Sequence, residues 1–220
     1  MAKKIYLSPS EQPENLYAYG ITNEKIQCRR ISAATAEALR RCGFEVIDAS
    51  SRTLSERCQE SNAWRADLHV PIHTNACNGK VTGTRIMCHA LSGEGYKASK
   101  AVFNALSPIT PGKSENISAA PNLYEVKHTL APCVYIEVDF HDVSDVAKWL
   151  IEHTVDIAEA ICRGICAYYN AEYKAAPKAV SGVIYRVQVG VYGSEANAKN
   201  MAKKLEAAGF HAIIVKGDNS

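Results

Sequence analysis

Segments of strand type and of helix type alternate along the first 170 residues, and this order limits the folds open to the chain. Short apolar runs typical of strands occur at residues 4–8, 44–49, 68–73, 83–90 and 133–140. Helical patterns occur at residues 26–42, 53–64, 93–106 and 144–169. Such alternation is typical of a parallel sheet covered on both sides. We therefore predict an α/β fold with a twisted, mostly parallel sheet flanked by helices on both faces.

A change of pattern after the last of these helices divides the chain. Residues 171–182, AEYKAAPKAVSG, show no periodicity, which is typical of a linker. A strand, helix, strand order then restarts over residues 183–217, with Ser194 as the candidate helix N-cap. We expect a first domain at residues 1–170, the linker, and a small β-α-β module at residues 183–220. A module of this size buries its faces poorly without a partner.

Composition and charge exclude several classes of protein. The chain has 220 residues, of which 47% are hydrophobic and 22% are charged, as in ordinary globular proteins. A net charge of +2 is too mild for a nucleic-acid-binding protein. The first residues, MAKKIYLSPS, lack the apolar core of a signal peptide, and no apolar run approaches the ~18 residues of a membrane span. We expect a protein made in the cytoplasm without a signal peptide or transmembrane segment.

Eight cysteines are scattered through the apolar helix and strand patterns without C-x-x-C pairs. Cys162 and Cys166 lie four residues apart on one predicted helix. Buried free thiols are the favoured interpretation, with disulfides or a cysteine metal site as the alternative. We expect no catalytic cysteine.

The stretch DLHVPIH carries two histidines, His69 and His73, in an alternating pattern of apolar residues. Pro71 between them excludes a helix interior, so the pattern predicts a strand that ends at His73 in a loop at residues 74–79. Both histidines then lie on one face of the strand. A histidine at the end of a strand is well placed for chemistry.

The stretch YIEVDFHD predicts that Glu137, Asp139 and His141 share one face of a strand. Three ionisable groups cannot all be buried unpaired, so some must meet a metal, each other or water. A zinc hydrolase needs N and O ligands and a carboxylate base, and His73, Glu24 and Glu137 are of suitable types. The alternative is that His73 is a satisfied core histidine and Glu137 belongs to a salt bridge.

Five motifs follow one another across residues 4–142: YLSPS, TNEKIQCRRISAATAEALRRCGFEV, DLHVPIHTNACNG, GTRIMCHA and LYEVKHTLAPCVYIEVDFHD. Together they resemble the zinc-dependent N-acetylmuramoyl-L-alanine amidases of the Amidase_3 family, and more closely the phage and prophage endolysin branch. The resemblance covers residues 1–170. It implies peptidoglycan as the substrate, Zn²⁺ as the cofactor, and action on the cell wall after release. The bond cleaved would join the lactyl group of N-acetylmuramic acid to L-alanine of the stem peptide.

The resemblance also implies roles for individual residues. Glu24 and His73 match zinc ligands of the family, and Glu137 matches its catalytic carboxylate. Relatives carry a further zinc-binding histidine after the first strand, but no histidine precedes His69 here. We expect Glu14 to replace that histidine, with Glu11, or a site with fewer protein ligands, as the alternatives.

The remaining polar residues near these motifs receive supporting roles. Lys127 stands where relatives often carry a basic residue, and we expect Lys127 and Asn75 to contact the substrate. For His69 we favour a hydrogen-bonded structural or supporting role. His128 and His141 are expected to orient or line the site rather than bind metal.

The C-terminal segment YRVQVGVYGSEANAKNMAKKLEAAGFHAIIV resembles one of the two β-α-β repeats of a SPOR domain. SPOR domains bind peptidoglycan glycan strands stripped of their stem peptides. We predict that two chains pair through residues 183–217 as a homodimer and so rebuild a full domain. A truncated tail is the alternative. For the whole chain, the alternatives to an amidase are a catalytically impaired cell-wall binder and a zinc peptidase.

Overall fold

The computed structural model describes residues 2–49, 52–113, 115–176 and 188–207, together with residues 210, 212 and 214. The chain divides into two compact units, Met1–Ala175 and Ala176–Ser220, and each is described by itself. The predicted domain limits at 1–170, 171–182 and 183–220 stay predictions.

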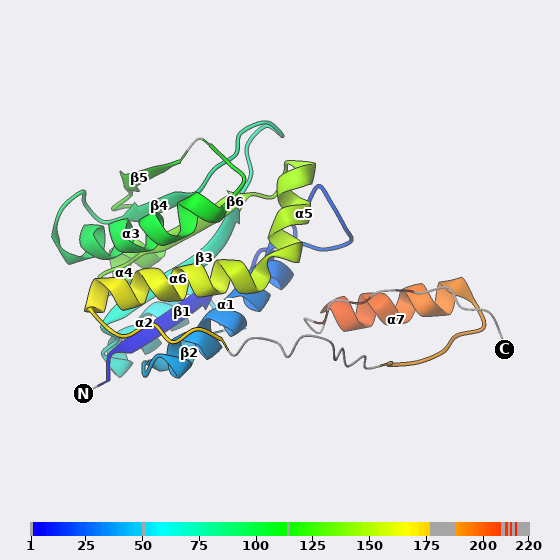
Figure 1. Ribbon diagram of the computed structural model, residues 1–220, viewed down its shortest axis with the longest axis horizontal. Helices are drawn as coiled ribbons and strands as arrows, with labels where there is room; N and C mark the ends of the chain where they lie inside the picture. Colours follow the sequence, from blue (N-terminus) through cyan, green and yellow to red (C-terminus); the bar gives the residue numbers. More distant parts are fainter. Residues whose placement is uncertain are drawn as a thin grey trace. The chain divides into compact units, whose positions relative to one another are not determined.

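A six-stranded sheet forms the centre of the N-terminal unit, in the order β2-β1-β3-β6-β4-β5 (Figure 1). Strands β2, β1, β3 and β6 are parallel to one another, whereas β4 runs antiparallel to β6 and parallel to β5. This arrangement confirms the predicted α/β fold with a mostly parallel sheet. The strands are β1 (Lys4–Pro9), β2 (Glu45–Asp48), β3 (Leu68–Asn75), β4 (Arg85–Cys88), β5 (Asn116–Ala119) and β6 (Tyr135–Phe140).

Helices cover both faces of this sheet. On one face α6 packs between α1 and α3, and on the other α2 contacts the short helix α4 (Figure 1). Apolar side chains of the central strands, such as Leu7, Val70 and Ile136, are fully buried in the core. The helices are α1 (Glu24–Arg41), α2 (Leu54–Trp64), α3 (Gly93–Leu106), α4 (Tyr124–His128), α5 (Ser144–Glu152) and α6 (Thr154–Tyr169), with a 3-10 turn at Ser107–Ile109.

Helix α1 begins two residues earlier than its apolar pattern predicts, and this start places a candidate site residue. The Asn23 side chain accepts a hydrogen bond from the backbone N–H of Ile26 at 3.0 Å, which caps the helix. Glu24 is therefore the first helical residue. Its carboxylate lies in the first turn, where the helix dipole favours a negative charge.

Three sequence-based expectations about the elements were wrong in detail. Strand β3 does not end at His73 but continues to Asn75, because Asn75 pairs with Phe140 across an irregularity in the ladder. The predicted helix at residues 144–169 is two helices, broken at His153, whose ring nitrogen contacts the Trp149 carbonyl oxygen at 2.9 Å. Strand β5 and helix α4, of four and five residues, were not predicted from the sequence.

In the C-terminal unit the structure describes one helix, α7 (Glu195–Ala207). The Ser194 hydroxyl accepts a hydrogen bond from the backbone N–H of Asn197 at 3.2 Å, so Ser194 caps the helix as predicted. Residues 188–193 form no strand, which contradicts that part of the predicted β-α-β pattern. Residues 183–187 and nearly all of the predicted final strand lie outside the described residues. None of the helices in the described parts of the chain is long and apolar enough to cross a membrane.

Candidate active site

The carboxyl ends of strands β3 and β6 bring a histidine and a glutamate together at one edge of the sheet. His73 and Glu137 are register partners on these neighbouring parallel strands, so their side chains lie on the same face. Ligands of open α/β sheets bind outside the carboxyl ends of the strands. The position therefore fits a functional site.

His73 also meets the carboxylate that begins helix α1. Its Nδ1 lies 2.8 Å from Oε1 of Glu24, and both side chains are buried. Asn15 holds the other carboxylate oxygen, because its side-chain amide donates to Glu24 Oε2 at 2.6 Å. The ring of His73 stacks on Tyr135, with centroids 4.7 Å apart. These contacts fix both His73 and Glu24 in one orientation.

Two buried polar atoms at this position have no hydrogen-bond partner in the structure: Nε2 of His73 and Oε2 of Glu137. A buried polar atom without a partner costs about 1–3 kcal/mol, so such atoms are rare in folded proteins. Two of them on register-paired residues indicate a site that is completed by a ligand or a reacting group.

The pKa values of Glu137 and His73 are raised above their ordinary values, whereas that of Glu24 is lowered. Burial raises the pKa of Glu137 to about 7, an effect that His73 opposes and the Glu24 charge reinforces. Burial acts in the same direction on Glu24, but hydrogen bonds from His73 and Asn15 outweigh it and lower the pKa of Glu24. Burial disfavours charge on His73, but Glu24 and Glu137 outweigh it and raise the pKa of the imidazole. The surroundings thus favour the charged carboxylate of Glu24 and the protonated form of His73, beside a Glu137 carboxyl whose pKa is raised to about 7.

His73 and Glu24 supply two of the ligand atoms that a zinc site needs. A histidine nitrogen and a carboxylate oxygen 2.8 Å apart are suitable ligand types, and both are positioned by further contacts. Glu14, the predicted third ligand, is exposed in the loop between β1 and α1. Among the described residues, no third His, Cys, Asp or Glu brings a ligand atom within 4.8 Å of both Glu24 and His73.

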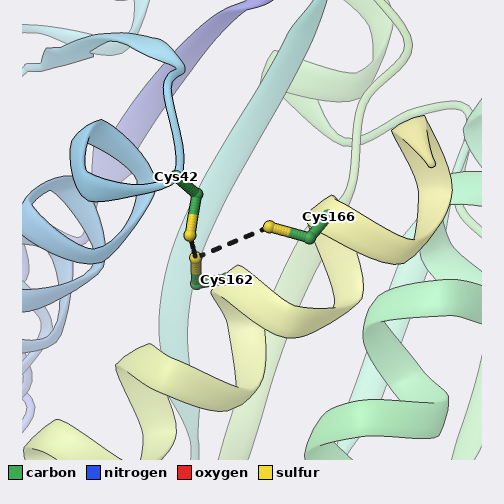
Figure 2. A group of neighbouring side chains, drawn as sticks. All are labelled: Cys42, Cys162 and Cys166. Atoms are coloured by element: carbon green, nitrogen blue, oxygen red, sulfur yellow. Dashed lines mark hydrogen bonds between the residues drawn. The ribbon is translucent and has the colours of Figure 1, made fainter. Parts of the chain in front are cut away.

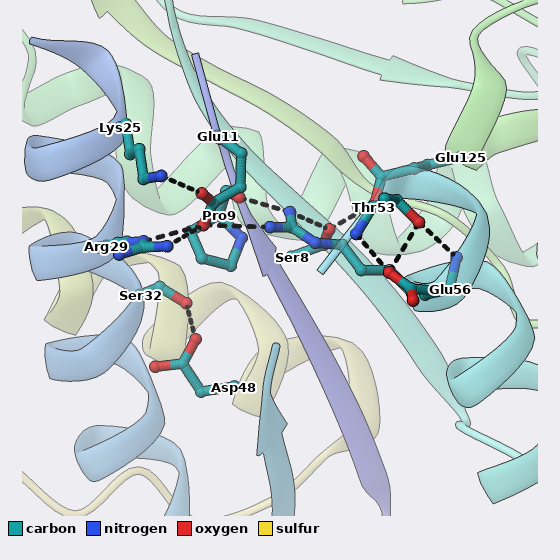
Figure 3. A network of polar contacts seen from close by, with 11 residues as sticks. Ser8, Pro9, Glu11, Lys25, Arg29, Ser32, Asp48, Thr53, Glu56 and Glu125 are labelled. Atoms are coloured by element: carbon teal, nitrogen blue, oxygen red, sulfur yellow. Dashed lines mark hydrogen bonds and ion pairs between the residues drawn. The ribbon is translucent and has the colours of Figure 1, made fainter. Parts of the chain in front are cut away.

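Glu11, the alternative third ligand, is held elsewhere by basic side chains (Figure 3). Its carboxylate contacts Lys25 at 2.7 Å, Arg29 at 2.5 Å and Arg57 at 3.3 Å. The guanidinium of Arg57 is fully buried and also donates to the Pro9 carbonyl oxygen at 2.5 Å. Glu11 therefore anchors the start of the β1–α1 loop to helices α1 and α2.

His69 is buried and fully hydrogen-bonded. Its Nδ1 lies 3.0 Å from the Ser61 hydroxyl, and its Nε2 lies 3.1 Å from Oε1 of Glu125. The ring stacks on Tyr6, with centroids 5.1 Å apart. Ser8 donates a further hydrogen bond to Glu125. This cluster is saturated, as expected for a structural or supporting histidine.

Asp139 and His141 lie near Glu137 in sequence, but their side chains are used by the fold. Asp139 accepts hydrogen bonds from the backbone N–H groups of Gly83 at 2.6 Å and Gly112 at 3.1 Å. His141 Nδ1 lies 2.9 Å from the Thr74 hydroxyl. The backbone thus satisfies the Asp139 carboxylate, which leaves Glu137 as the carboxylate of β6 that faces His73.

The predicted substrate-binding residues lie in two different environments. Asn75 is half-buried at the end of β3, and its side-chain oxygen accepts a hydrogen bond from the Ala76 N–H at 2.8 Å. Lys127 is exposed on α4 and lines a hollow of about 390 Å³. His128 is also exposed and contacts its own helix, where Nδ1 lies 2.8 Å from the Tyr124 carbonyl oxygen.

Sequence reasoning missed two residues that organise this region. Asn15 supports Glu24, and Glu125 pairs with His69. The only signal for Glu125 was an acidic residue beside Lys127 in a segment without periodicity. Asn15 lies in a loop, where no pattern predicts which way a side chain points.

The protein is an open α/β protein in which a histidine and two carboxylates meet at the carboxyl edge of the sheet, where such proteins bind their ligands. A profile of the Amidase_3 family, described as N-acetylmuramoyl-L-alanine amidase, matches residues 12–167, and the chain belongs to that family. A second profile, that of the SPOR domain, matches residues 181–220 at the C-terminus.

Relatives of the chain are distant in sequence. The N-acetylmuramoyl-L-alanine amidase CwlM of Bacillus licheniformis is 24% identical over 228 residues, which cover 98% of this chain and 86% of that protein. A sporulation-specific N-acetylmuramoyl-L-alanine amidase of Bacillus subtilis (strain 168) is 25% identical over 167 residues, or 76% of this chain and 63% of that one. The chain spans 48% of a Clostridium perfringens protein to which it is 28% identical over 165 residues.

Solved structures share the fold. The catalytic domain of CwlV, an N-acetylmuramoyl-L-alanine amidase from Bacillus (Paenibacillus) polymyxa var. colistinus, superposes with a TM-score of 0.68 at 19% identity, covering 77% of this chain and 99% of that domain. The CwlD amidase of Clostridioides difficile, solved in complex with the GerS lipoprotein, gives a TM-score of 0.65 at 23% identity, with coverages of 76% and 98%. At these identities the likeness concerns the fold.

Proposed function

We propose that the chain is a zinc-dependent N-acetylmuramoyl-L-alanine amidase that cleaves peptidoglycan between N-acetylmuramic acid and L-alanine of the stem peptide. Family membership supports the reaction type. The observation that carries the proposal is the register pairing of His73 with Glu137, next to the 2.8 Å contact of His73 with Glu24. In this proposal His73 would supply a nitrogen ligand, Glu24 an oxygen ligand and Glu137 a separate carboxylate, and the contacts among the three support it.

Each residue has a distinct task in this proposal. Glu24 and His73 would hold zinc, which supplies Lewis-acid polarisation of the scissile carbonyl and of the attacking water. Glu137 accepts the proton of that water and passes it to the leaving amine, a task suited to a carboxyl with a pKa of about 7. Asn75 and Lys127 are proposed to hold the substrate.

Two of the three proposed zinc ligands, Glu24 and His73, lie together in the structure. We retain Glu14 for the third position as a proposal, since loops can rearrange when a ligand binds. A site with only two protein ligands would bind metal weakly, and that observation favours the second candidate function, a catalytically impaired cell-wall binder.

One experiment separates the two functions. The full chain, supplied with Zn²⁺, is incubated with purified peptidoglycan sacculi, and the new chain ends are identified by mass spectrometry. An amidase releases L-alanine amino termini and leaves intact muramic acid. A binder sediments with the sacculi and releases nothing, and release of other stem-peptide ends would indicate a peptidase.

For the C-terminal unit we propose binding to glycan strands, supported by the SPOR match. We also propose that two chains pair through residues 183–217. Ala198, Met201 and Leu205 lie on one side of α7 and are only half-buried, so a second copy could cover them. A monomer in light scattering at micromolar concentration would refute the pairing. Action on the cell wall after release, as in phage lysis, stays part of this proposal.

A further inference from the structure

Three cysteines from distant parts of the sequence converge at the end of helix α1 that is remote from the candidate active site (Figure 2). Cys42 directly follows α1, and Cys162 and Cys166 lie one turn apart on α6, which packs against α1. The Sγ atom of Cys162 lies 3.6 Å from that of Cys42 and 4.0 Å from that of Cys166. All three sulfur atoms lie within 4.8 Å of one another.

This spacing matches that of sulfur ligands around a tetrahedral metal ion. A Zn–S bond of about 2.3 Å places two sulfur ligands at tetrahedral positions about 3.8 Å apart. The two measured separations, 3.6 and 4.0 Å, lie on either side of that value. An ion could therefore enter with little movement of the side chains. Within the described parts of the chain, this is the only group of three or more His, Cys, Asp or Glu with such close ligand atoms.

The surroundings of the three sulfur atoms favour a bound cation. Cys42 caps the C-terminal end of α1, where the helix dipole carries partial negative charge. Its sulfur also accepts a hydrogen bond from the backbone N–H of Lys174 at 3.3 Å and lies 3.7 Å from the carbonyl oxygen of the same residue. Cys162 and Cys166 are buried, and Cys42 is half-buried.

This cluster is separate from the candidate active site. Helix α1 has 18 residues and begins at Glu24, so at 1.5 Å per residue its two ends are about 27 Å apart. The ligands also differ in kind, since Glu24 and His73 offer oxygen and nitrogen. A spectroscopic signal that depends on sulfur can therefore report on the cysteines alone.

We propose that Cys42, Cys162 and Cys166 form a thiolate metal site, distinct from the active site, that binds one soft divalent cation such as Zn²⁺. Three sulfur ligands leave the fourth tetrahedral position to a water molecule or another small donor. Binding replaces the thiol protons by the metal and joins the end of α1 to α6. The site would thus stabilise the packing of these two helices.

The test uses the full chain, freed of metal by a chelator and kept under a non-thiol reductant. Co²⁺ is then titrated in, because cobalt bound by thiolates shows sulfur-to-metal charge-transfer absorption that nitrogen and oxygen ligands do not give. We expect this absorption to saturate at one equivalent in the wild type and to be absent in Cys162→Ser. Cys42→Ser and Cys166→Ser should each weaken cobalt binding at least tenfold.

Two matched controls and one direct measurement keep the outcome clear. Cys133→Ser, at a buried thiol outside the cluster, and Cys77→Ser, at an exposed thiol, should keep the full absorption. X-ray absorption of the wild-type cobalt protein should report three sulfur neighbours, a result that does not depend on how well a variant folds. Absence of charge-transfer absorption in the reduced wild type, its persistence in Cys162→Ser, or fewer than three sulfur neighbours would overturn the proposal.

Discussion

His69 and His73 lie four residues apart on the same face of β3, and each meets a buried carboxylate, yet their surroundings differ. His69 uses both ring nitrogens, one toward Ser61 and the other toward Glu125. His73 uses only Nδ1, toward Glu24, and its Nε2 is buried without a partner. The two histidines stack on tyrosines in a similar way, so packing alone does not distinguish them.

The neighbours of the two histidines explain the difference. His69 lies deeper along the strand, where helices α2 and α4 supply a partner for each nitrogen. His73 lies at the strand end, where its neighbour on β6 is Glu137, a second carboxylate with an unpartnered oxygen. Filled hydrogen bonds stabilise a fold, whereas open ones leave donor atoms for a ligand or a reaction. We therefore expect mutations at the two positions to affect different properties.

The largest expected effect is on the reaction. Glu137→Gln should lower amidase activity by about 10²- to 10⁴-fold, because a proton acceptor of the reaction is lost. Zinc content, measured by atomic absorption, should stay that of the wild type, since Glu137 is proposed as a base and not as a ligand. If the variant loses zinc as well, Glu137 is a ligand and its assignment as the base is wrong.

The second effect is on stability. His69→Ala should lower the free energy of unfolding by about 3–4 kcal/mol, because it opens a cavity and removes a hydrogen-bond partner from the buried Glu125. Chemical denaturation of the metal-free protein measures this change. His73→Ala is the matched variant, and it should lose zinc while destabilising the metal-free protein by less. Equal losses of stability would show that the two sites do not differ as described.

The sequence predicts the part of this contrast that depends on neighbouring residues, but not the contacts between residues far apart in the chain. The alternation around Pro71 correctly places both histidines on one strand face, because that is a local property of a strand. The partners come from α1, α2 and α4, and of these the sequence singled out only Glu24, by its residue type and by the family resemblance. Likewise, Cys42 and Cys162 are 120 residues apart, and only the packing of α6 against α1 brings them together.

Glu137, next to His73, and Glu125, next to His69, should contribute to the stability of the metal-free protein with opposite dependence on pH. Burial raises the pKa of Glu137 to about 7, above the ordinary value of 4.5, so its contribution to stability is fully present below pH 4.5 and is lost as the pH rises to 7. Burial would also raise the pKa of Glu125, but hydrogen bonds from His69 and Ser8 lower it overall. Its contribution is therefore present above the unfolded pKa and is lost as the pH falls through the folded pKa.

Substitution by glutamine tests this contrast. At pH 8 Glu137→Gln should stabilise the metal-free protein, by about 3 kcal/mol at most, because burial raises the pKa of Glu137 from 4.5 to about 7. At the same pH Glu125→Gln should destabilise it by about 1–3 kcal/mol. In urea titrations the Glu137→Gln difference should shrink as the pH falls from 7 toward 4.5, whereas the Glu125→Gln difference should shrink only below pH 4.5, as the pH approaches the lowered pKa of Glu125. A change of the same sign in both variants at pH 8 would contradict the assigned pKa directions.

The smallest effects should come from Ser61 and Asn15, the uncharged residues that hydrogen-bond to His69 and to Glu24. Ser61→Ala removes one hydrogen bond from His69 and should cost about 1 kcal/mol in stability, with unchanged zinc affinity. Asn15→Ala removes the hydrogen bond to Glu24 Oε2 and should weaken zinc binding about 10- to 100-fold, because contacts to a ligand orient it. Thermal denaturation and competition with a zinc chelator measure the two quantities on both variants. If Ser61→Ala weakens zinc binding as much as Asn15→Ala does, the two histidine clusters act as one site.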